Sequence, residues 1–329
     1  MNKILKTTIA GLVFLTSATA SYAADCGIGK SHVRILSNDF PALHSITDMA
    51  KECANSKVKV TVNHTSEHKN LQVAALKPNP AEYSGVIISN GSFVPLHRQG
   101  LIRPLDKYVS KYGADLQKSQ LITFGGKVMS IAFMANTQHL IYREDILKKA
   151  GVSVPTTLEE VLEACRIIRA KGLLKNPFAA AYKAGWNLAE EFVNMYLGHG
   201  GKFFKPGSPK PAINNKTGVA ALKALKALTG YSNPDFLTFE SEGVKAQWEA
   251  GQVALMFMWA SRAPTLLDDE GSTPEIVANT KLTGPVTVAG GSTPVGTLWW
   301  DGFVISENVS EADAEATFRR SEERRVGKE

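Results

Sequence analysis

Apolar and amphipathic segments alternate along residues 32–89 in the order strand, helix, strand, helix, strand. Short apolar or alternating runs predict three strands, at 32–37, 58–63 and 84–89. Apolar residues at helical spacing predict a helix at 42–54, and Ser66 is placed to cap a second helix. Elements alternating in this way are typical of a parallel sheet with helices on both faces. The first part of the chain is therefore predicted to be an α/β lobe.

The same patterns predict further strands and helices in the rest of the chain. Strands are expected at 128–133, 253–258, 286–289 and 302–306, and helices at 140–150, 158–170, 186–198, 217–228 and 242–250. Gly151 is placed to end one helix, and Thr157 with Glu160 forms a capping box at the start of the next. Because no internal repeat or low-complexity linker separates two halves, we expect several strands to join two lobes.

The first 23 residues have the pattern of a cleavable secretory signal peptide. Lys3 and Lys6 precede a short apolar run, and Ala23 provides the small residue required before a cleavage site. The apolar run is too short to span a bilayer, and no later segment is longer. Cys26 is not in the context of a lipid-anchored cysteine. We therefore expect a soluble periplasmic protein that begins at Ala24.

Composition narrows the class of protein. The chain has 329 residues, more than one domain usually contains, which favours two lobes. The formal net charge of +6 includes Lys3, Lys6 and a charged tail at 319–329, so the remaining sequence is close to neutral. Nucleic-acid binding requires a clustered basic face. We therefore expect no nucleic-acid partner.

The three cysteines are expected to behave differently. An oxidising compartment favours pairing of two of them, and Cys26 and Cys53 lie at the two ends of a strand–helix unit that an antiparallel helix would bring together. Spacing alone does not establish disulfide geometry, so this bridge is a hypothesis. Cys165 lies in the apolar stripe of the helix at 158–170 and is expected to be a buried free thiol.

Three ordered stretches of the chain carry a recognisable pattern. The first is 83–93 followed by Gly100-Leu101-Ile102-Arg103-Pro104-Leu105, the second runs through 126–128, 135–137, 142–145 and 155–157, and the third is 250–259. Together they resemble the bacterial extracellular solute-binding proteins of ABC importers, specifically the maltose-binding-like, carbohydrate-type members. Several segments in the same order are more specific than any single motif. The likeness covers about residues 30 to 318.

The resemblance implies an α/β, two-lobe periplasmic-binding-protein architecture of type II with an incomplete second lobe. It places the signal peptide at 1–23, the N-terminal lobe at 24–131 and 262–310, and the C-terminal lobe at 132–261 and 311–318. Members of the family usually continue with further helices, whereas this chain ends in the charged segment 319–329. We expect that segment to be foreign read-through after a truncation; the alternative is a natural solvated tail.

The candidate ligand-binding residues follow predicted strands or start helices, because ligands of open α/β sheets bind at the carboxyl ends of strands. They are Asn38, Asp39, Glu67, Ser89, Asn90, Ser92, Asn136, Trp186, Trp259, Arg262, Trp299 and Trp300. Indole rings suit the apolar faces of sugars, and adjacent residues of a strand point to opposite faces, so at most one of Trp299 and Trp300 is expected to face a ligand. The alternatives are helix caps and turns for the polar residues, and core packing for the tryptophans.

We therefore predict a monomeric periplasmic binding protein that captures a sugar or oligosaccharide between its lobes and delivers it to the membrane subunits of an ABC importer. Ligand would favour a closed form through hinges near 132–136 and 259–262. We expect no cofactor, no catalytic residues and no metal site, since His64 and His68 have no third ligand at compatible spacing. Two alternatives stay open: the same fold binding a polyamine or another charged solute, and an exported carbohydrate-active enzyme.

Overall fold

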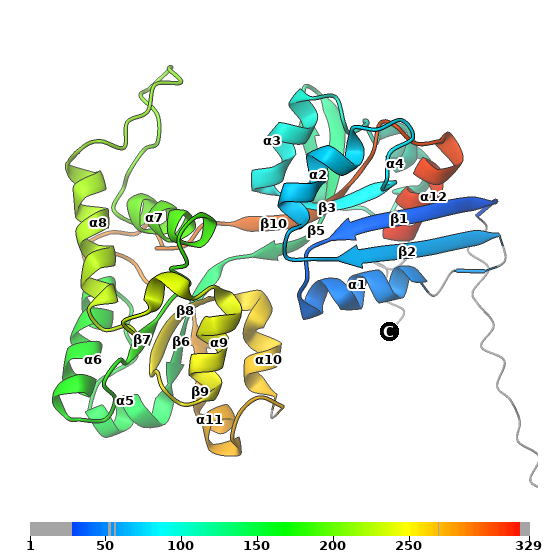
Figure 1. Cartoon of the computed structure of the whole chain (residues 1–329). Helices are drawn as coiled ribbons and strands as arrows, with labels where there is room; N and C mark the ends of the chain where they lie inside the picture. The colour runs from blue at the N-terminus through cyan, green and yellow to red at the C-terminus, as the bar shows by residue number, and fades with distance from the viewer. Residues whose placement is uncertain (1–27, 52–53, 56, 269, 323–329) are drawn as a thin grey trace, which may run out of the picture. The chain divides into compact units, whose positions relative to one another are not determined.

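The computed structural model describes residues 28–51, 54, 55, 57–268 and 270–322, and Figure 1 shows it as a ribbon. The described residues form two sheets with helices, and the fold is of the α/β class that the sequence predicts. The chain divides into two compact units: unit 1 contains the described residues of 1–86, 108–115 and 305–329, and unit 2 those of 87–107 and 116–304. The proposed signal peptide and the proposed Cys26–Cys53 bridge lie outside the described residues.

The larger sheet has six strands in the order β2-β1-β3-β10-β5-β4. These are β1 (Ser31–Ser37), β2 (Val58–His64), β3 (Gly85–Ser89), β4 (Leu121–Phe124), β5 (Lys127–Asn136) and β10 (Trp299–Ile305). β1 pairs in parallel with β2 and β3, whereas β5 pairs antiparallel with β4 and β10. The associated helices are α1 (Pro41–Lys51), α2 (His68–Leu76), α3 (Asn90–Arg98), α4 (Asp106–Tyr112) and α12 (Glu311–Glu322).

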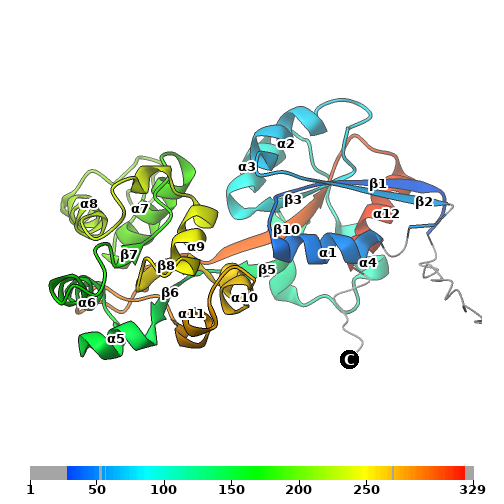
Figure 2. The ribbon, with the colours of Figure 1, turned by 60° about the horizontal axis from the view of Figure 1, so that its bottom comes forward.

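The smaller sheet lies in unit 2 and has four strands in the order β7-β8-β6-β9. These are β6 (Gln138–Arg143), β7 (Phe178–Ala179), β8 (Leu255–Trp259) and β9 (Thr280–Thr283). The helices of this part are α5 (Glu144–Ala150), α6 (Leu158–Ala170), α7 (Trp186–Gly198), α8 (Lys216–Thr229), α9 (Ser241–Glu249), α10 (Ala263–Leu267) and α11 (Pro274–Asn279). α5 contacts both β6 and α6, and Figure 2 shows α5 and α6 side by side.

Two helix ends that were predicted from local sequence patterns are confirmed. Thr157 accepts a hydrogen bond from the Glu160 N–H, and the Glu160 side chain accepts one in return from the Thr157 N–H, which confirms the capping box of α6. Gly151 follows α5 with a φ of 69°, a left-handed conformation that glycine adopts without steric cost. Ser66, by contrast, does not cap α2, whose N-cap is Glu67 without a side-chain capping bond.

Cys165 is a free, fully buried thiol in the core of unit 2, as predicted. It packs in a cluster that includes Val161, Ile168 and Phe178. Burial raises the pKa of this thiol to about 12, because the apolar surroundings disfavour the thiolate. Cys165 therefore contributes as a small apolar side chain.

Two predicted elements differ from the structure, and so does the turn at Asn90-Gly91 that was the alternative to a ligand role. Residues 140–143 were expected to start a helix but belong to strand β6, which pairs with β8 on one side and β9 on the other. The adjacent residues Leu140 and Ile141 are both buried, so both faces of the strand are covered. A strand buried on both faces has a continuous apolar run, which resembles a buried helix. Residues 286–289 form no strand, and Thr287 makes only isolated bridges to Thr157 and Pro294. Asn90 and Gly91 form the first turn of α3, not an isolated turn.

Helix α12 lies in unit 1. Its buried side chains include Ala314, Thr317 and Phe318, and Phe318 stacks on Tyr108 of α4 with ring centroids 5.5 Å apart. The helix also contacts β1. The apolar face of this helix therefore completes the core of unit 1.

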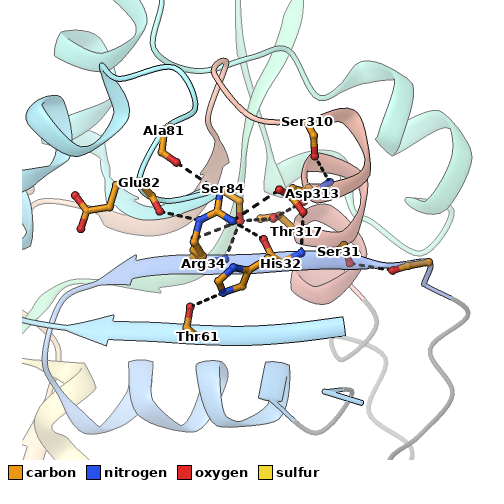
Figure 3. Close-up of polar contacts among 11 residues, drawn as sticks. Ser31, His32, Arg34, Thr61, Ala81, Glu82, Ser84, Ser310, Asp313 and Thr317 are labelled. Atoms are coloured by element: carbon orange, nitrogen blue, oxygen red, sulfur yellow. Dashed lines mark hydrogen bonds and ion pairs between the residues drawn. The ribbon is translucent and has the colours of Figure 1, made fainter. Parts of the chain in front are cut away.

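A polar network fixes α12 to β1 (Figure 3). Asp313 accepts a hydrogen bond of 2.7 Å from the His32 backbone N–H, and its second carboxylate oxygen lies 3.7 Å from the Arg34 guanidinium. Ser84 accepts hydrogen bonds from the Arg34 backbone N–H, at 2.9 Å, and from the Thr317 hydroxyl, at 2.6 Å. We call Arg34, Ser84, Asp313 and Thr317 the α12 network.

Candidate functional site

Three tryptophans form a cluster in unit 2, which we call the indole cluster: Trp186, Trp259 and Trp299. The ring centroids of Trp186 and Trp259 are 6.3 Å apart with the planes inclined by 21°, a stacked arrangement. Trp299 meets both rings edge-on, with centroid distances of 5.5 Å to Trp186 and 5.8 Å to Trp259. These are the separations and orientations that aromatic pairs prefer.

Each indole stands at the end of a regular element. Trp186 is the first residue of α7, and the turn before it requires Gly185, whose φ is 108°. Trp259 ends β8 and Trp299 begins β10. The side chain of Trp186 is 44% exposed, whereas Trp259 is buried. The cluster therefore has a buried base and an exposed ring at its edge.

Strand pairing explains why the tryptophans meet although they are far apart in sequence. Trp299 pairs with Asn136 at the end of β5, and Trp259 pairs with Gln138 at the start of β6. Residues 136 and 138 are almost adjacent in the chain, so the ends of β10 and β8 are brought together. Trp300 follows Trp299 in β10, and adjacent residues of an extended strand point to opposite faces. Among the described residues, it makes no ring contact with the indole cluster.

Two further predicted residues lie beside the indole cluster. Asn136 is buried and forms a pair of hydrogen bonds with Ser261: its amide nitrogen donates to the hydroxyl at 3.0 Å, and its oxygen accepts from the Ser261 N–H at 3.3 Å. Arg262 forms an ion pair with Glu242, at 3.0 Å. Burial lowers the pKa of Arg262, and Glu242 opposes that effect. Both residues therefore hold the turn that follows Trp259.

The predicted residues of unit 1 make local contacts. Asp39 lies 2.7 Å from His44, whose ring stacks on that of His64. His64 in turn lies 3.1 Å from the Asn38 carbonyl oxygen. Glu67 accepts a hydrogen bond of 2.6 Å from Asn70 in the first turn of α2. These contacts are those of loop and helix-start residues, the alternative that the sequence left open.

Ser89, Asn90 and Ser92 surround the junction between β3 and α3. The Ser89 hydroxyl is buried and has no hydrogen-bond partner within the described ranges. Asn90 Oδ1 accepts a hydrogen bond from the Gly91 N–H at 3.1 Å, and Ser92 is buried in α3. A Cβ added to Gly91 would lie 3.7 Å from Cη2 of Trp299, so the junction comes close to the indole cluster.

Sequence reasoning missed a buried polar network next to the indole cluster. Gln138 donates a hydrogen bond of 2.7 Å to Glu191 and accepts one of 3.1 Å from Asn194. Asn194 Oδ1 accepts from the Thr297 N–H at 2.8 Å, and the Thr297 hydroxyl donates to Glu190 at 2.5 Å. We call these five residues the α7 network. The available signal was the presence of three polar residues, Glu190, Glu191 and Asn194, in the middle of a mostly apolar helix.

The α7 network changes the titration of Glu191. The pKa of this carboxyl is raised to about 8, chiefly because the group is buried; the hydrogen bond from Gln138 lowers the pKa, and the Glu190 carboxylate raises it. Neighbouring Tyr182 is fully buried, and burial together with Glu191 raises its pKa well above the ordinary value. Glu191 is therefore protonated at neutral pH.

The two histidines with metal-ligand spacing have other contacts. His64 lies 2.9 Å from the Thr47 hydroxyl, and His68 is buried at the start of α2, where burial lowers its pKa to about 4. In the described part of the chain, no group of three or more His, Cys, Asp or Glu side chains is arranged to hold a metal ion. None of the described helices has both the length and the apolar character needed to cross a membrane.

A family model matches this chain. It describes the bacterial extracellular solute-binding proteins and covers residues 41–316. A curated relative, described as a probable ABC transporter-binding protein of Deinococcus radiodurans, is 30% identical over 143 residues, which are 42% of this chain and 34% of that protein. The match thus spans about a third of the curated relative's length.

Solved structures with the same fold include proteins with bound carbohydrates or polyols. A maltose-bound protein of T. maritima has a TM-score of 0.75 at 18% identity, with 88% of this chain and 75% of that chain covered. A solute-binding protein of Agrobacterium radiobacter K84 in complex with ribitol has a TM-score of 0.77 at 21% identity, with coverages of 90% and 77%. A third, from Agrobacterium vitis S4 with D-mannitol, has a TM-score of 0.74 at 17% identity, with coverages of 89% and 72%. At these identities the likeness concerns the fold.

Proposed function

Because the chain belongs to the bacterial extracellular solute-binding proteins, we propose that it captures a sugar or sugar alcohol and delivers it to the membrane subunits of an ABC importer. The proposal includes export by the N-terminal signal peptide and action as a monomer in the periplasm. The ligand class is supported by the fold relatives that carry maltose, ribitol and D-mannitol.

The indole cluster is the observation that carries this proposal. A sugar presents C–H faces that pack on aromatic rings, and hydroxyls that need fixed polar partners. Trp186 offers an exposed ring, and the two neighbouring indoles hold that ring in place. The rigid base lowers the entropy lost on binding. We therefore assign Trp186 as the stacking platform and Trp259 and Trp299 as its support.

The polar part of the proposed site comes from side chains near the cluster. Asn136 and Arg262 are already oriented by Ser261 and Glu242. The buried Ser89 hydroxyl and Asn90 lie at the β3–α3 junction, where Gly91 approaches Trp299. Asn38, Asp39, Glu67 and Ser92 remain predicted ligand residues, and the hydrogen bonds of Asp39 and Glu67 are to neighbouring residues of the same segment. Trp300 is not included in the proposed site.

Binding without turnover is part of the proposal. The family consists of binding proteins, and Glu190 and Glu191 contact different partners within the α7 network. A glycosidase needs two carboxyl groups that flank one bond. Incubation with a bound oligosaccharide should leave it intact by chromatography; release of shorter sugars would favour the enzyme alternative.

Thermal-shift measurements with maltose, ribitol, D-mannitol and putrescine test the ligand class. Because a ligand stabilises the state that binds it, a bound sugar or polyol should raise the melting temperature in a concentration-dependent manner. A shift with putrescine alone would replace the carbohydrate proposal by the polyamine alternative.

The proposed platform is tested by Trp186→Ala, with Trp300→Ala as the matched control. Loss of one stacked ring should weaken binding of the active sugar by about tenfold, as aromatic pairs are worth about 0.5–1.5 kcal/mol beyond the area they bury. Calorimetry measures the change. Equal affinity of the two variants for the sugar would mean that Trp186 contributes to packing and not to ligand binding.

A further inference from the structure

The α7 network links the three segments that carry the indole cluster. Glu190 and Asn194 lie on α7, four and eight residues after Trp186, and so on the same helix face. Gln138 is the strand partner of Trp259. Thr297 precedes Trp299 by two residues and is held by both Asn194 and Glu190. The network therefore contacts the chain close to every ring of the cluster.

We propose that the α7 network is the positioning device of the indole cluster, and that ionisation of Glu191 changes the arrangement of the three rings. The consequence for ligand rests on the proposed function: a displaced Trp186 platform would bind a sugar more weakly. The indole geometry itself is a property of the unliganded protein.

The α7 network is expected to respond to pH because an ionised Glu191 would be a buried negative charge. Glu191 is 2% exposed, and the groups that act on it are the Gln138 amide, the Glu190 carboxylate and the Tyr182 phenol. None of the described residues supplies it with a cation. An ionised Glu191 therefore has one hydrogen bond and a like charge beside it, an arrangement that costs free energy in a low-dielectric interior. Movement of Glu191 towards water would pull on Gln138 and on α7.

Two other titrating groups near Glu191, the Tyr182 phenol and the Cys165 thiol, stay protonated over the same pH range. The pKa of Tyr182 lies well above its ordinary value, and that of Cys165, which interacts with Tyr182, is about 12. Glu191 itself titrates near pH 8. A spectral step of the tryptophans between pH 6.5 and 9.5 would thus report Glu191, provided that it disappears when this carboxyl is removed.

The deciding experiment is a pH titration of tryptophan fluorescence and near-UV circular dichroism on the protein without ligand. Wild type should show a step centred near pH 8, whereas Glu191→Gln should lose the step and keep the low-pH spectrum. Glu163→Gln, which removes an exposed carboxylate paired with Arg166 on α6, should keep the step. Trp186→Phe should reduce its amplitude, because that ring belongs to the cluster.

A second variant distinguishes positioning from mere packing. Gln138→Met removes the hydrogen bond that favours the ionised form of Glu191, so the midpoint should move to higher pH. An unchanged midpoint in Gln138→Met, or a step that persists in Glu191→Gln, would overturn the proposal. Far-UV circular dichroism establishes that each variant is folded.

The outcome is separable from that of the proposed function. If none of maltose, ribitol and D-mannitol binds, the proposed ligand class fails, yet the fluorescence titration still decides the role of the α7 network. If a sugar binds with the same affinity from pH 6.5 to 9.5 while the spectral step is present, the proposed function stands, and the coupling of the network to ligand is excluded.

Discussion

The α12 network of unit 1 and the α7 network of unit 2 are both polar and largely buried, but the carboxyl groups in them have different partners. Asp313 of the α12 network has the Arg34 guanidinium and a backbone N–H as partners. Glu191 of the α7 network has a neutral amide and a second carboxyl group. The first network pairs its carboxylate with a cation, whereas in the second network burial and a neighbouring carboxylate raise the pKa of the carboxyl group.

The difference separates a structural role from a functional one. The ion pair of Asp313 with Arg34 and its hydrogen bond from the His32 N–H anchor α12 on β1 (Figure 3). The ionised form of a buried carboxyl group is unfavourable when a second carboxylate lies beside it. Groups with pKa values shifted in this way are concentrated at functional sites. The α7 network, which lies beside the indole cluster, is therefore expected to have a functional role.

The largest expected effect is the pH dependence that Glu191 adds to stability. Its pKa is about 8 in the folded protein and about 4.5 in the unfolded chain, so the folded state holds an extra proton between these values. Stability should therefore fall as the pH rises from 5 to 8 by about 4 kcal/mol, and this contribution should be constant above pH 8.

The measurement is urea unfolding of wild type and Glu191→Gln at several pH values. The difference in unfolding free energy between the two should grow in favour of the variant up to pH 8. A difference that is independent of pH would show that Glu191 is ionised in the folded protein, and the contrast between the two networks would disappear.

The second effect concerns the carboxylate of the α12 network. Asp313→Ala removes a hydrogen bond to the His32 N–H and the ion pair with Arg34, and should lower the unfolding free energy by about 2 kcal/mol at pH 7. Asp48→Ala is the control in the same unit, because Asp48 pairs with Lys51 on an exposed surface. Equal stability of the two variants would mean that the α12 network is no anchor.

The smallest effect is expected at the edge of the α7 network. Thr297→Val keeps the shape of the side chain but removes the hydroxyl that donates to Glu190, and should lower the unfolding free energy by about 1 kcal/mol. Thr229→Val, at the end of α8, removes a hydroxyl that bonds only the local Lys226 carbonyl and is the control. A larger loss in the control than in Thr297→Val would contradict the importance of the network.

Much of the fold could be predicted because its signals are local. The capping box of Thr157 and Glu160, the left-handed Gly151 and the helix at 186–198 all depend on residues within a few positions of one another. Residues 140–143 were misassigned because a strand buried on both faces has no alternation to distinguish it from a buried helix.

The candidate site was predicted in part. Trp186 and Trp259 were chosen because each stands at an element end, and the structure brings them together with Trp299. The α7 network was not predicted, since Gln138, Glu191 and Thr297 come from three distant segments and each is unremarkable alone. Only the pairing of β6 with β8 and the packing of α7 make them neighbours.

The sequence by itself determined the α/β class, most element positions and the resemblance to solute-binding proteins, because these follow from local periodicity and ordered motifs. Only the tertiary structure decided which of Trp299 and Trp300 joins the indole cluster, where α12 packs, and which acids are buried together. The physical reason is that burial and electrostatic interaction require groups to be close together in space. Residues far apart in the chain come close together only when the chain folds.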